Sequence, residues 1–224
     1  FYHSAQSIYT INFYKTYTKY IEPYILSLNG KAKKALIFDC DNTLWKGILG
    51  EIGINKIEMS PKTKDGAIFA EIQSIALSLS KKGVLIGLCS KNNFSDVEEV
   101  LMNHPDMLLK DKHITFKKVN WLNKVTNLQN IAQELNISLD SMVFIDDSPF
   151  EIDLVKNKLK EVTVIKVPEL LYDYPRVLRE ISNFFYNPFF NTTDKDKTKI
   201  YKQQANRIAG RNNFVNIEDY LKSL

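Results

Sequence analysis

Two pairs of aspartates stand where apolar segments of this sequence stop, and carboxylates in that arrangement can hold a metal ion. The segment KKALIFDCDNTLWKG (33–47) ends an apolar run at Asp39 and adds Asp41 two residues later. A second apolar run stops at Asp146 and Asp147. Close carboxylates in a low-dielectric crevice repel one another by on the order of several kcal/mol. A hard cation such as Mg²⁺, which takes oxygen ligands, relieves that repulsion.

Helix capping is the alternative explanation for these acids. An aspartate after a strand often starts a turn or caps the following helix. Capping would explain a single aspartate, but it explains pairs of aspartates at two strand ends of one sheet less well. We therefore expect Mg²⁺ as the cofactor.

The elements that must position these residues alternate between strands and helices. Such alternation is typical of βαβ units, so the sequence predicts an α/β fold with a parallel sheet covered by helices on both faces. A further helix is expected over 7–28, and the chain after Pro168 reads as helical without more strands. The expected strands are 34–38, 84–89, 113–119, 142–145 and 162–166, and the expected helices between them are 61–82, one from about 95, 123–136 and one from about 149.

In open α/β sheets the ligand lies beyond the carboxyl ends of the strands, where the strand order reverses. The residues at three strand ends should therefore meet at one edge of the sheet. They are Asp39-Cys40-Asp41, Ser90-Lys91-Asn92 and Asp146-Asp147.

Composition narrows the class of protein. The chain has 224 residues, 44% of them apolar and 25% charged, and a net charge of +4, which is too small to indicate nucleic-acid binding. Segment 192–211 holds six Lys or Arg and two Asp, and it reads either as a solvated helix face or as a docking surface for an acidic partner. No run is apolar enough for a membrane span, and scattered histidines and two cysteines indicate neither a zinc site nor a disulfide scaffold. We expect a cytoplasmic protein.

Four segments, in order, resemble the motifs of the haloacid dehalogenase (HAD) superfamily, and more closely those of its FkbH-like branch (subfamily IIIC). The resemblance runs from about residue 31 to 215 and includes a similar tail, TDKDKTKIY (193–201). It implies a Rossmann-like, HAD-type sheet. The four segments are DCDNTLWKGILGEIG (39–53), CSKNN (89–93), NWLNKVTN (120–127) and FIDDSPFE (144–151).

The resemblance implies a role for each site residue. Asp39 would be the nucleophile that forms an aspartyl-phosphate, and Asp41 would protonate the leaving oxygen and then deprotonate the acceptor. Lys124 would be the third catalytic residue, offsetting the phosphoryl charge. The expected phosphate-binding residues are Thr43, Ser90, Lys91 and Asn92. The expected metal ligands are Asp39 and Asp147 through their side chains and Asp41 through its backbone carbonyl. Asp146 would orient these ligands or bind the metal through water, although Asp146 and Asp147 could exchange roles.

Several residues have simpler readings. Lys124 alone would be a solvated helix lysine, and Cys89 fits a buried strand position as well as an acyl-carrying thiolate. Cys40 should face the core, and Trp45 and Trp121 should be apolar anchors before they are substrate-stacking surfaces. Three residues depart from the family pattern, which leaves substrate identity open: Lys46, Ile52 and Ser148.

The resemblance also suggests how the chain is organised. We expect a helical linker over 1–30, a HAD-like catalytic core over 31–168 and a helical extension over 169–224 that packs on it. Segments 46–61 and 94–118 are too short for an inserted cap domain, so the crevice should be open to a large or carrier-bound substrate, or covered by a neighbouring domain. The start at Phe1 suggests a piece of a longer polypeptide.

Three functions follow from the resemblance and its departures. FkbH-like proteins are associated with loading a glyceryl group from 1,3-bisphosphoglycerate onto an acyl carrier protein, and this chain would dephosphorylate that unit. The alternative is a phosphatase acting on a sugar or other metabolite phosphate. A non-catalytic interaction module is the third reading, against which the intact aspartates and Lys124 argue.

Overall fold

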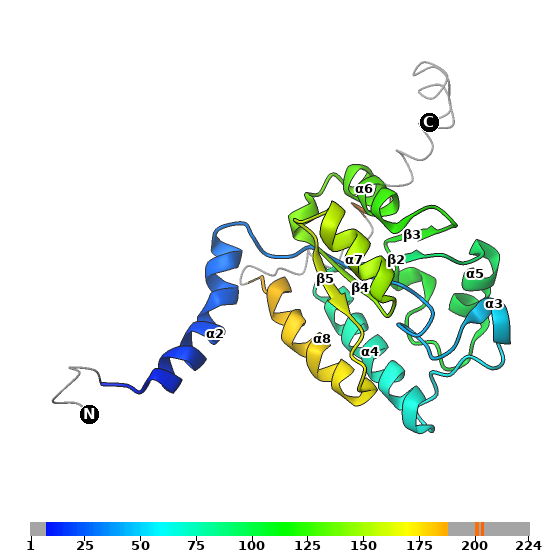
Figure 1. Ribbon diagram of the computed structural model, residues 1–224, viewed down its shortest axis with the longest axis horizontal. Helices are drawn as coiled ribbons and strands as arrows, with labels where there is room; N and C mark the ends of the chain where they lie inside the picture. The colour runs from blue at the N-terminus through cyan, green and yellow to red at the C-terminus, as the bar shows by residue number, and fades with distance from the viewer. Residues whose placement is uncertain (1–7, 188–199, 202, 204–224) are drawn as a thin grey trace, which may run out of the picture.

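A five-stranded sheet with the order β3-β2-β1-β4-β5 forms the centre of the computed structural model, which describes residues 8–187, 200, 201 and 203. Every neighbouring pair of strands is parallel, which confirms the predicted α/β fold class (Figure 1). The strand order reverses between β1 and β4, since the chain passes from β1 to β2 and β3 before it returns to β4. The strands are β1 (Ala35–Phe38), β2 (Leu85–Ser90), β3 (Phe116–Val119), β4 (Met142–Asp146) and β5 (Thr163–Lys166).

The central strands are apolar along their whole length because both faces of the sheet are covered. In β1, Leu36 and Phe38 pack into one hydrophobic core, and Ala35 and Ile37 pack into the other. All four side chains are fully buried. Strand β1 is therefore surrounded by apolar side chains, and the polar residues that follow it lie at the carboxyl edge of the sheet.

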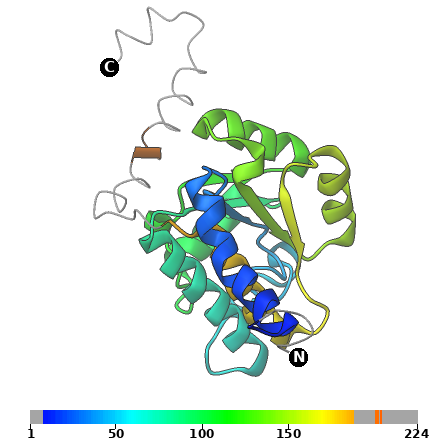
Figure 2. The same ribbon diagram turned by 90° about the vertical axis from the view of Figure 1, so that its left-hand side faces the viewer.

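Helices cover each face of the sheet (Figures 1 and 2). On one face, α4 (Lys64–Lys81), α5 (Phe94–Asn103) and α8 (Tyr174–Ser182) share a core with the strands. On the other face, α6 (Lys124–Leu135) and α7 (Pro149–Lys158) do so. Helix α8 packs along α4, which attaches this part of segment 169–224 to the sheet domain.

The structure differs from the predicted elements at several boundaries and adds one short helix; helix α2 (Ile11–Leu28), for example, begins later than residue 7. Helix α4 begins at Lys64 after Thr63 rather than at Pro61, which lies in a turn. Strand β3 starts at Phe116, because a 3₁₀ turn, η1 (Asp111–His113), occupies the beginning of the predicted strand. The loop after β1 contains a short helix, α3 (Leu49–Ile52), that was not predicted.

No folded cap is inserted in the described parts of the two connections where one could occur. The connection from β1 to α4 holds α3 and two isolated backbone pairings, Asp41 with Trp45 and Lys46 with Glu58. The connection from β2 to β3 holds α5 and η1. The carboxyl edge of the sheet is thus bordered by short loops. Three more 3₁₀ turns complete the described elements: η2 (Leu139–Ser141), η3 (Leu171–Asp173) and η4 (Asn183–Phe185).

Helix α2 (Ile11–Leu28) projects from the sheet domain and contacts it near η4, where the ring centroids of Tyr24 and Tyr186 lie 4.3 Å apart (Figure 1). Thr10 caps it by accepting a hydrogen bond from the Phe13 amide at 3.2 Å. No residue of α2 is buried. Among the described helices, none has the length and apolar character needed to cross a bilayer. The basic segment 192–211 and the tail 193–201 lie almost entirely outside the described residues.

Strand β2 contains a glycine that is required by its neighbour. Gly87 pairs with Phe116 of β3. A Cβ atom on Gly87 would lie 1.9 Å from the Phe116 ring, which is closer than any real contact between carbon atoms. The absence of a side chain at Gly87 therefore makes room for an aromatic ring in the core between the sheet and α6.

Candidate active site

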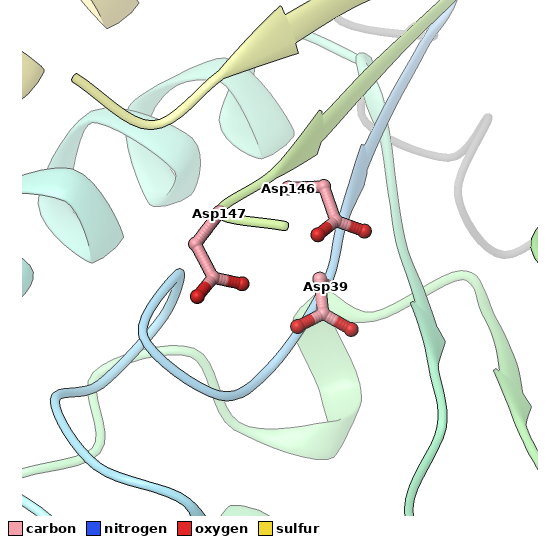
Figure 3. A group of neighbouring side chains, drawn as sticks. All are labelled: Asp39, Asp146 and Asp147. Atoms are coloured by element: carbon pink, nitrogen blue, oxygen red, sulfur yellow. The ribbon is translucent and has the colours of Figure 1, made fainter. Parts of the chain in front are cut away.

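Asp39, Asp146 and Asp147, which sequence reasoning expected at one sheet edge, do meet there. Asp39 follows the last residue of β1, Asp146 is the last residue of β4, and Asp147 comes next. Figure 3 shows these three side chains gathered beside the ends of the two strands. Carboxylate oxygens of the three residues lie within 4.8 Å of one another. Ser90 is the last residue of β2, and Lys124 is the first residue of α6, which follows β3. Because all the strands are parallel, these residues lie at the same edge of the sheet as Asp39 and Asp146.

Lys124 is buried between two of the aspartates. Its Nζ donates a hydrogen bond to Asp39 Oδ1 at 2.8 Å and another to Asp146 Oδ2. The side chains of Lys124, Asp39 and Asp146 are 5%, 8% and 0% exposed. The alternative reading of Lys124 as a solvated helix lysine is therefore wrong.

Burial and neighbouring charges set the ionisation of this group. Burial raises the pKa of Asp39 to about 6, because the opposing effect of Lys124 only partly compensates and the Asp146 charge adds to the rise. Burial lowers the pKa of Lys124, but the charges of Asp39 and Asp146 outweigh that effect and raise it overall. Lys124 is therefore a fixed positive charge at any ordinary pH.

Asp146 and Asp147 have different surroundings. Asp146 is fully buried, bound to Lys124 through one oxygen, and accepts the Ser148 amide at 2.8 Å through the other. Asp147 is only partly buried. Its pKa is raised by burial and then by the charge of Asp39, against a hydrogen bond from the Asn42 side chain that lowers it. Asp147 thus has more free ligand capacity than Asp146.

Three donors hold the carboxylate of Asp41. Trp45 Nε1 and the Leu49 amide donate to Oδ1 at 2.9 and 3.1 Å, and Asn92 Nδ2 donates to Oδ2 at 2.9 Å. Asn92 Nδ2 also lies 3.3 Å from Ser90 Oγ. Asn92 therefore connects the end of β2 to the loop after β1, and the orientation of Asp41 is fixed by the fold.

Thr43 carries a buried hydroxyl without a hydrogen-bond partner among the described residues. Its side chain is fully buried, and its backbone carbonyl accepts a hydrogen bond from the Tyr174 hydroxyl at 3.3 Å. An unsatisfied buried hydroxyl costs about 1–3 kcal/mol, so such a group calls for an explanation. The Thr43 hydroxyl is therefore left with unused hydrogen-bonding capacity in the loop after β1.

Lys91 is held away from the carboxylate cluster by an ion pair. Its Nζ lies 2.6 Å from Glu151 Oε1, and the Glu151 side chain is 7% exposed. The second oxygen of Glu151 is buried and has no partner among the described residues. The structure thus brings Ser90, Thr43 and Asn92 to the site loops and pairs Lys91 with α7.

Three subsidiary predictions have clear outcomes. Cys40 and Trp45 are fully buried, as expected of core residues. Cys89 is also fully buried, and burial raises the pKa of its thiol, so a thiolate nucleophile at this position is disfavoured. The apolar-anchor reading of Trp121 is wrong: its side chain is 70% exposed, and its Nε1 donates to Asn93 Oδ1 at 3.3 Å.

Sequence reasoning missed three residues that shape the site. Asn42 adopts a left-handed conformation (φ 50°) and accepts the Gly47 amide at 2.9 Å while it supports Asp147. An asparagine after two acids is a usable signal for such a turn. Glu151 could have been noticed as the fourth residue of Ser-x-x-Glu, a helix-start pattern. Nothing in the sequence connects Tyr174 with the loop after β1.

The donor set fits a hard divalent cation. Three carboxylates face one lysine, which leaves an excess of negative charge in a largely buried place. Oxygen atoms from Asp39 and Asp147, with backbone carbonyls and water, are the ligands that Mg²⁺ prefers. Sulfur and imidazole ligands, which softer metals would favour, are not part of this cluster.

The chain is similar to one solved structure in particular. This is the crystal structure of the N-terminal part of the protein BF1531 from Bacteroides fragilis, which contains a phosphatase domain and was solved in complex with Mg. The identity is 39%, the TM-score is 0.70, and the match covers 73% of this chain and 43% of that chain. No protein-family profile and no curated protein matches the sequence significantly. The similarity and the observed sheet together show that this chain has a Rossmann-like α/β phosphatase fold.

Proposed function

We propose that this chain is a Mg²⁺-dependent phosphatase of the HAD type that acts through an aspartyl-phosphate on Asp39. One observation carries the proposal: Asp39, Asp147 and Lys124 meet at the carboxyl edge of the sheet. It is supported by the 39% identity between the matched part of this chain and a protein fragment that contains a phosphatase domain complexed with Mg. Fold alone would not support an activity, but the positions of the charged groups do.

In this mechanism Asp39 attacks phosphorus and the bond to the leaving oxygen breaks. Lys124 keeps the Asp39 carboxylate oriented through its 2.8 Å hydrogen bond and contributes positive charge next to the phosphoryl oxygens. The aspartyl-phosphate that results divides one difficult displacement into two easier ones. Water then attacks phosphorus, and Asp39 is released with inorganic phosphate.

Asp41 handles the proton in both steps. Its hydrogen bonds to Trp45, Leu49 and Asn92 fix its position relative to Asp39. Asp41 protonates the leaving alcohol oxygen in the first step and takes a proton from water in the second. A rigid carboxylate suits this role because proton transfer requires the two heavy atoms to be within hydrogen-bonding distance.

The remaining polar groups bind the phosphoryl oxygens. The unpartnered hydroxyl of Thr43 and the hydroxyl of Ser90 are the proposed donors, while Lys91 and Asn92 stay predicted contacts that each have a protein partner. Asp39, Asp147 and the Asp41 carbonyl would hold Mg²⁺, with Asp146 in the second shell. When bound, this ion would neutralise the carboxylates and the phosphoryl charge.

The test is hydrolysis of p-nitrophenyl phosphate by the purified protein with Mg²⁺ or with EDTA. We expect turnover that requires the metal, and a loss of at least about a thousandfold in Asp39→Asn, which lacks the nucleophile. Asp153→Asn is the matched control, because Asp153 is an exposed aspartate on α7. Turnover by Asp39→Asn at the level of the unmodified protein would refute the nucleophile assignment.

Transfer of a glyceryl group onto an acyl carrier protein is a second, narrower proposal. It is supported by the open carboxyl edge, since neither described connection contains a cap that would exclude a carrier-bound substrate. Mass spectrometry of a carrier protein after incubation with 1,3-bisphosphoglycerate tests it. A mass gain supports transfer, whereas phosphate release without a mass gain leaves hydrolysis of a sugar or metabolite phosphate.

A further inference from the structure

A cavity of about 370 Å³ adjoins the carboxylate cluster and is not used by the mechanism above. Asp147 and Asn42 form part of its wall, so it opens directly beside the proposed metal site. Lys46, which follows β1, and Lys166, which ends β5, line the same cavity. We call it the Lys46–Lys166 pocket.

The pocket combines an apolar wall with two ammonium groups. Phe69, Val167 and Leu171 supply apolar surface from α4, the segment after β5 and η3. A volume of this size lies at the lower end of the range of roughly 300–1,000 Å³ for small-molecule sites. The pocket can therefore accept a small organic group, but not a large one.

Its backbone framework is firm, while its two charges can be redirected. The Lys46 amide donates to the Glu58 carbonyl at 2.9 Å, and the Glu58 amide donates back at 3.0 Å, which fixes the main chain beside the pocket. The Lys46 ammonium lies 2.6 Å from Asp65, and that of Lys166 lies 3.4 Å from Glu169. These ion pairs are solvent-exposed, and such pairs contribute little to stability. A substrate anion can therefore compete for both lysines at little cost.

The charge balance of the pocket depends on the metal site. In the protein alone, the two lysines are offset by Asp147 and Glu169 in the pocket wall and by Asp65, the ion-pair partner of Lys46. A dication held by Asp147 would neutralise that carboxylate, so that only the exposed acids Asp65 and Glu169 would oppose the two lysines next to the reacting phosphoryl group. An anionic leaving group would then be attracted to the pocket, whereas a neutral one would gain only apolar contact.

We propose that the Lys46–Lys166 pocket receives the alcohol part of the substrate, and that Lys46 and Lys166 select an alcohol bearing an anionic group of its own, a carboxylate or a second phosphate. This inference rests on the proposed phosphatase function. It identifies the substrate class as a small phosphomonoester with a further negative charge. Both lysines are specificity-determining residues in this assignment, and neither takes part in the chemical step.

The test uses three substrates that differ only at the far end of a three-carbon alcohol: propyl phosphate, 3-(phosphonooxy)propanoate and propane-1,3-diyl bisphosphate. We expect the unmodified protein to prefer at least one of the two charged esters. In Lys46→Gln and in Lys166→Gln, the ratio of kcat/KM for the preferred ester to that for propyl phosphate should fall about tenfold, mostly through KM, because an ammonium–anion hydrogen bond is lost. Lys112→Gln, an exposed lysine on η1, is the control and should keep the ratio.

The outcomes separate this inference from the function on which it rests. Equal kcat/KM for all three esters in the unmodified protein, or an unchanged ratio in both lysine variants, would overturn the inference and leave the phosphatase intact. Absence of Mg²⁺-dependent turnover with every ester would refute the phosphatase and the inference with it. A preference for the carboxylate alone or the bisphosphate alone supports the inference and names the anion.

Discussion

Lys124 offers the most direct test of how this site is held together, because it neutralises two buried acids at once. We predict that Lys124→Met destabilises the metal-free protein strongly at neutral pH. Methionine retains the length of the side chain but removes the hydrogen bonds to Asp39 and Asp146. Removing one partner of a buried ion pair typically costs about 3–5 kcal/mol, because the remaining charge has no compensation. That is a large part of a typical total stability of about 5–15 kcal/mol.

The loss should depend on pH in a defined direction. The pKa of Asp39 is already raised, from 3.8 to about 6, and Lys124 lowers the pKa of both Asp39 and Asp146. Without Lys124 the pKa values of Asp39 and Asp146 in the folded protein rise further above those in the unfolded chain. Protonation of these acids then stabilises the folded state at low pH, and this stabilisation is lost as the pH rises. The deficit of the variant should therefore be small at about pH 5 and reach its full size at about pH 8.

Urea unfolding of both proteins in EDTA at these two pH values measures the effect. Lys118→Met is the matched control, because Lys118 forms an ion pair with Glu134 at 2.5 Å in which the side chains are 21% and 24% exposed. A partly exposed pair of this kind should contribute no more than about 1 kcal/mol. A deficit for Lys124→Met below about 1 kcal/mol at high pH, or one equal at both pH values, would refute the reasoning.

Two further predictions concern the cation and the sheet. Protonation of Asp39, which has a pKa of about 6, competes with Mg²⁺ binding. The Mg²⁺ affinity measured by calorimetry should therefore fall by up to about tenfold for each pH unit below pH 6. A Mg²⁺ affinity that does not change with pH would contradict this prediction. Gly87→Ala should cost about 1–3 kcal/mol in urea unfolding, because the new methyl group meets the Phe116 ring. Phe116→Leu in the same chain should recover part of that loss, and a purely additive double variant would show that the ring is not the cause.

The sheet and the carboxylate cluster could be predicted from sequence because both depend on local patterns. A run such as Ala35–Phe38 is apolar at every position, and two acids at its end have few structural uses. Parallel pairing then brings Asp39 and Asp146 together whatever the connecting segments do. The predicted phosphate and metal contacts themselves stay predictions, which the experiments above address.

The parts that could not be predicted depend on contacts between distant segments. Lys91 and Glu151 are 60 residues apart and meet only through the packing of the fold, in which α7 lies against β4, β5 and α6. Their ion pair therefore leaves no trace in the local sequence. Tyr174 reaches the Thr43 carbonyl across 131 residues. The prediction for Trp121 was wrong because its size and apolarity indicate burial. In the structure, Trp121 lies in the loop before α6 and its side chain is exposed to solvent.

The exposure of helix α2, which contacts the rest of the described chain mainly near η4, has a consequence for local unfolding. A helix of 18 residues that buries no side chain depends mainly on its own backbone hydrogen bonds, which are marginal in water at that length. Its amide hydrogens should therefore exchange with deuterium long before those of β1 and β4, even where a single melting transition is recorded for the sheet. We therefore expect α2 and the sheet to unfold as separate cooperative units, and a bulk melting curve to report only on the sheet.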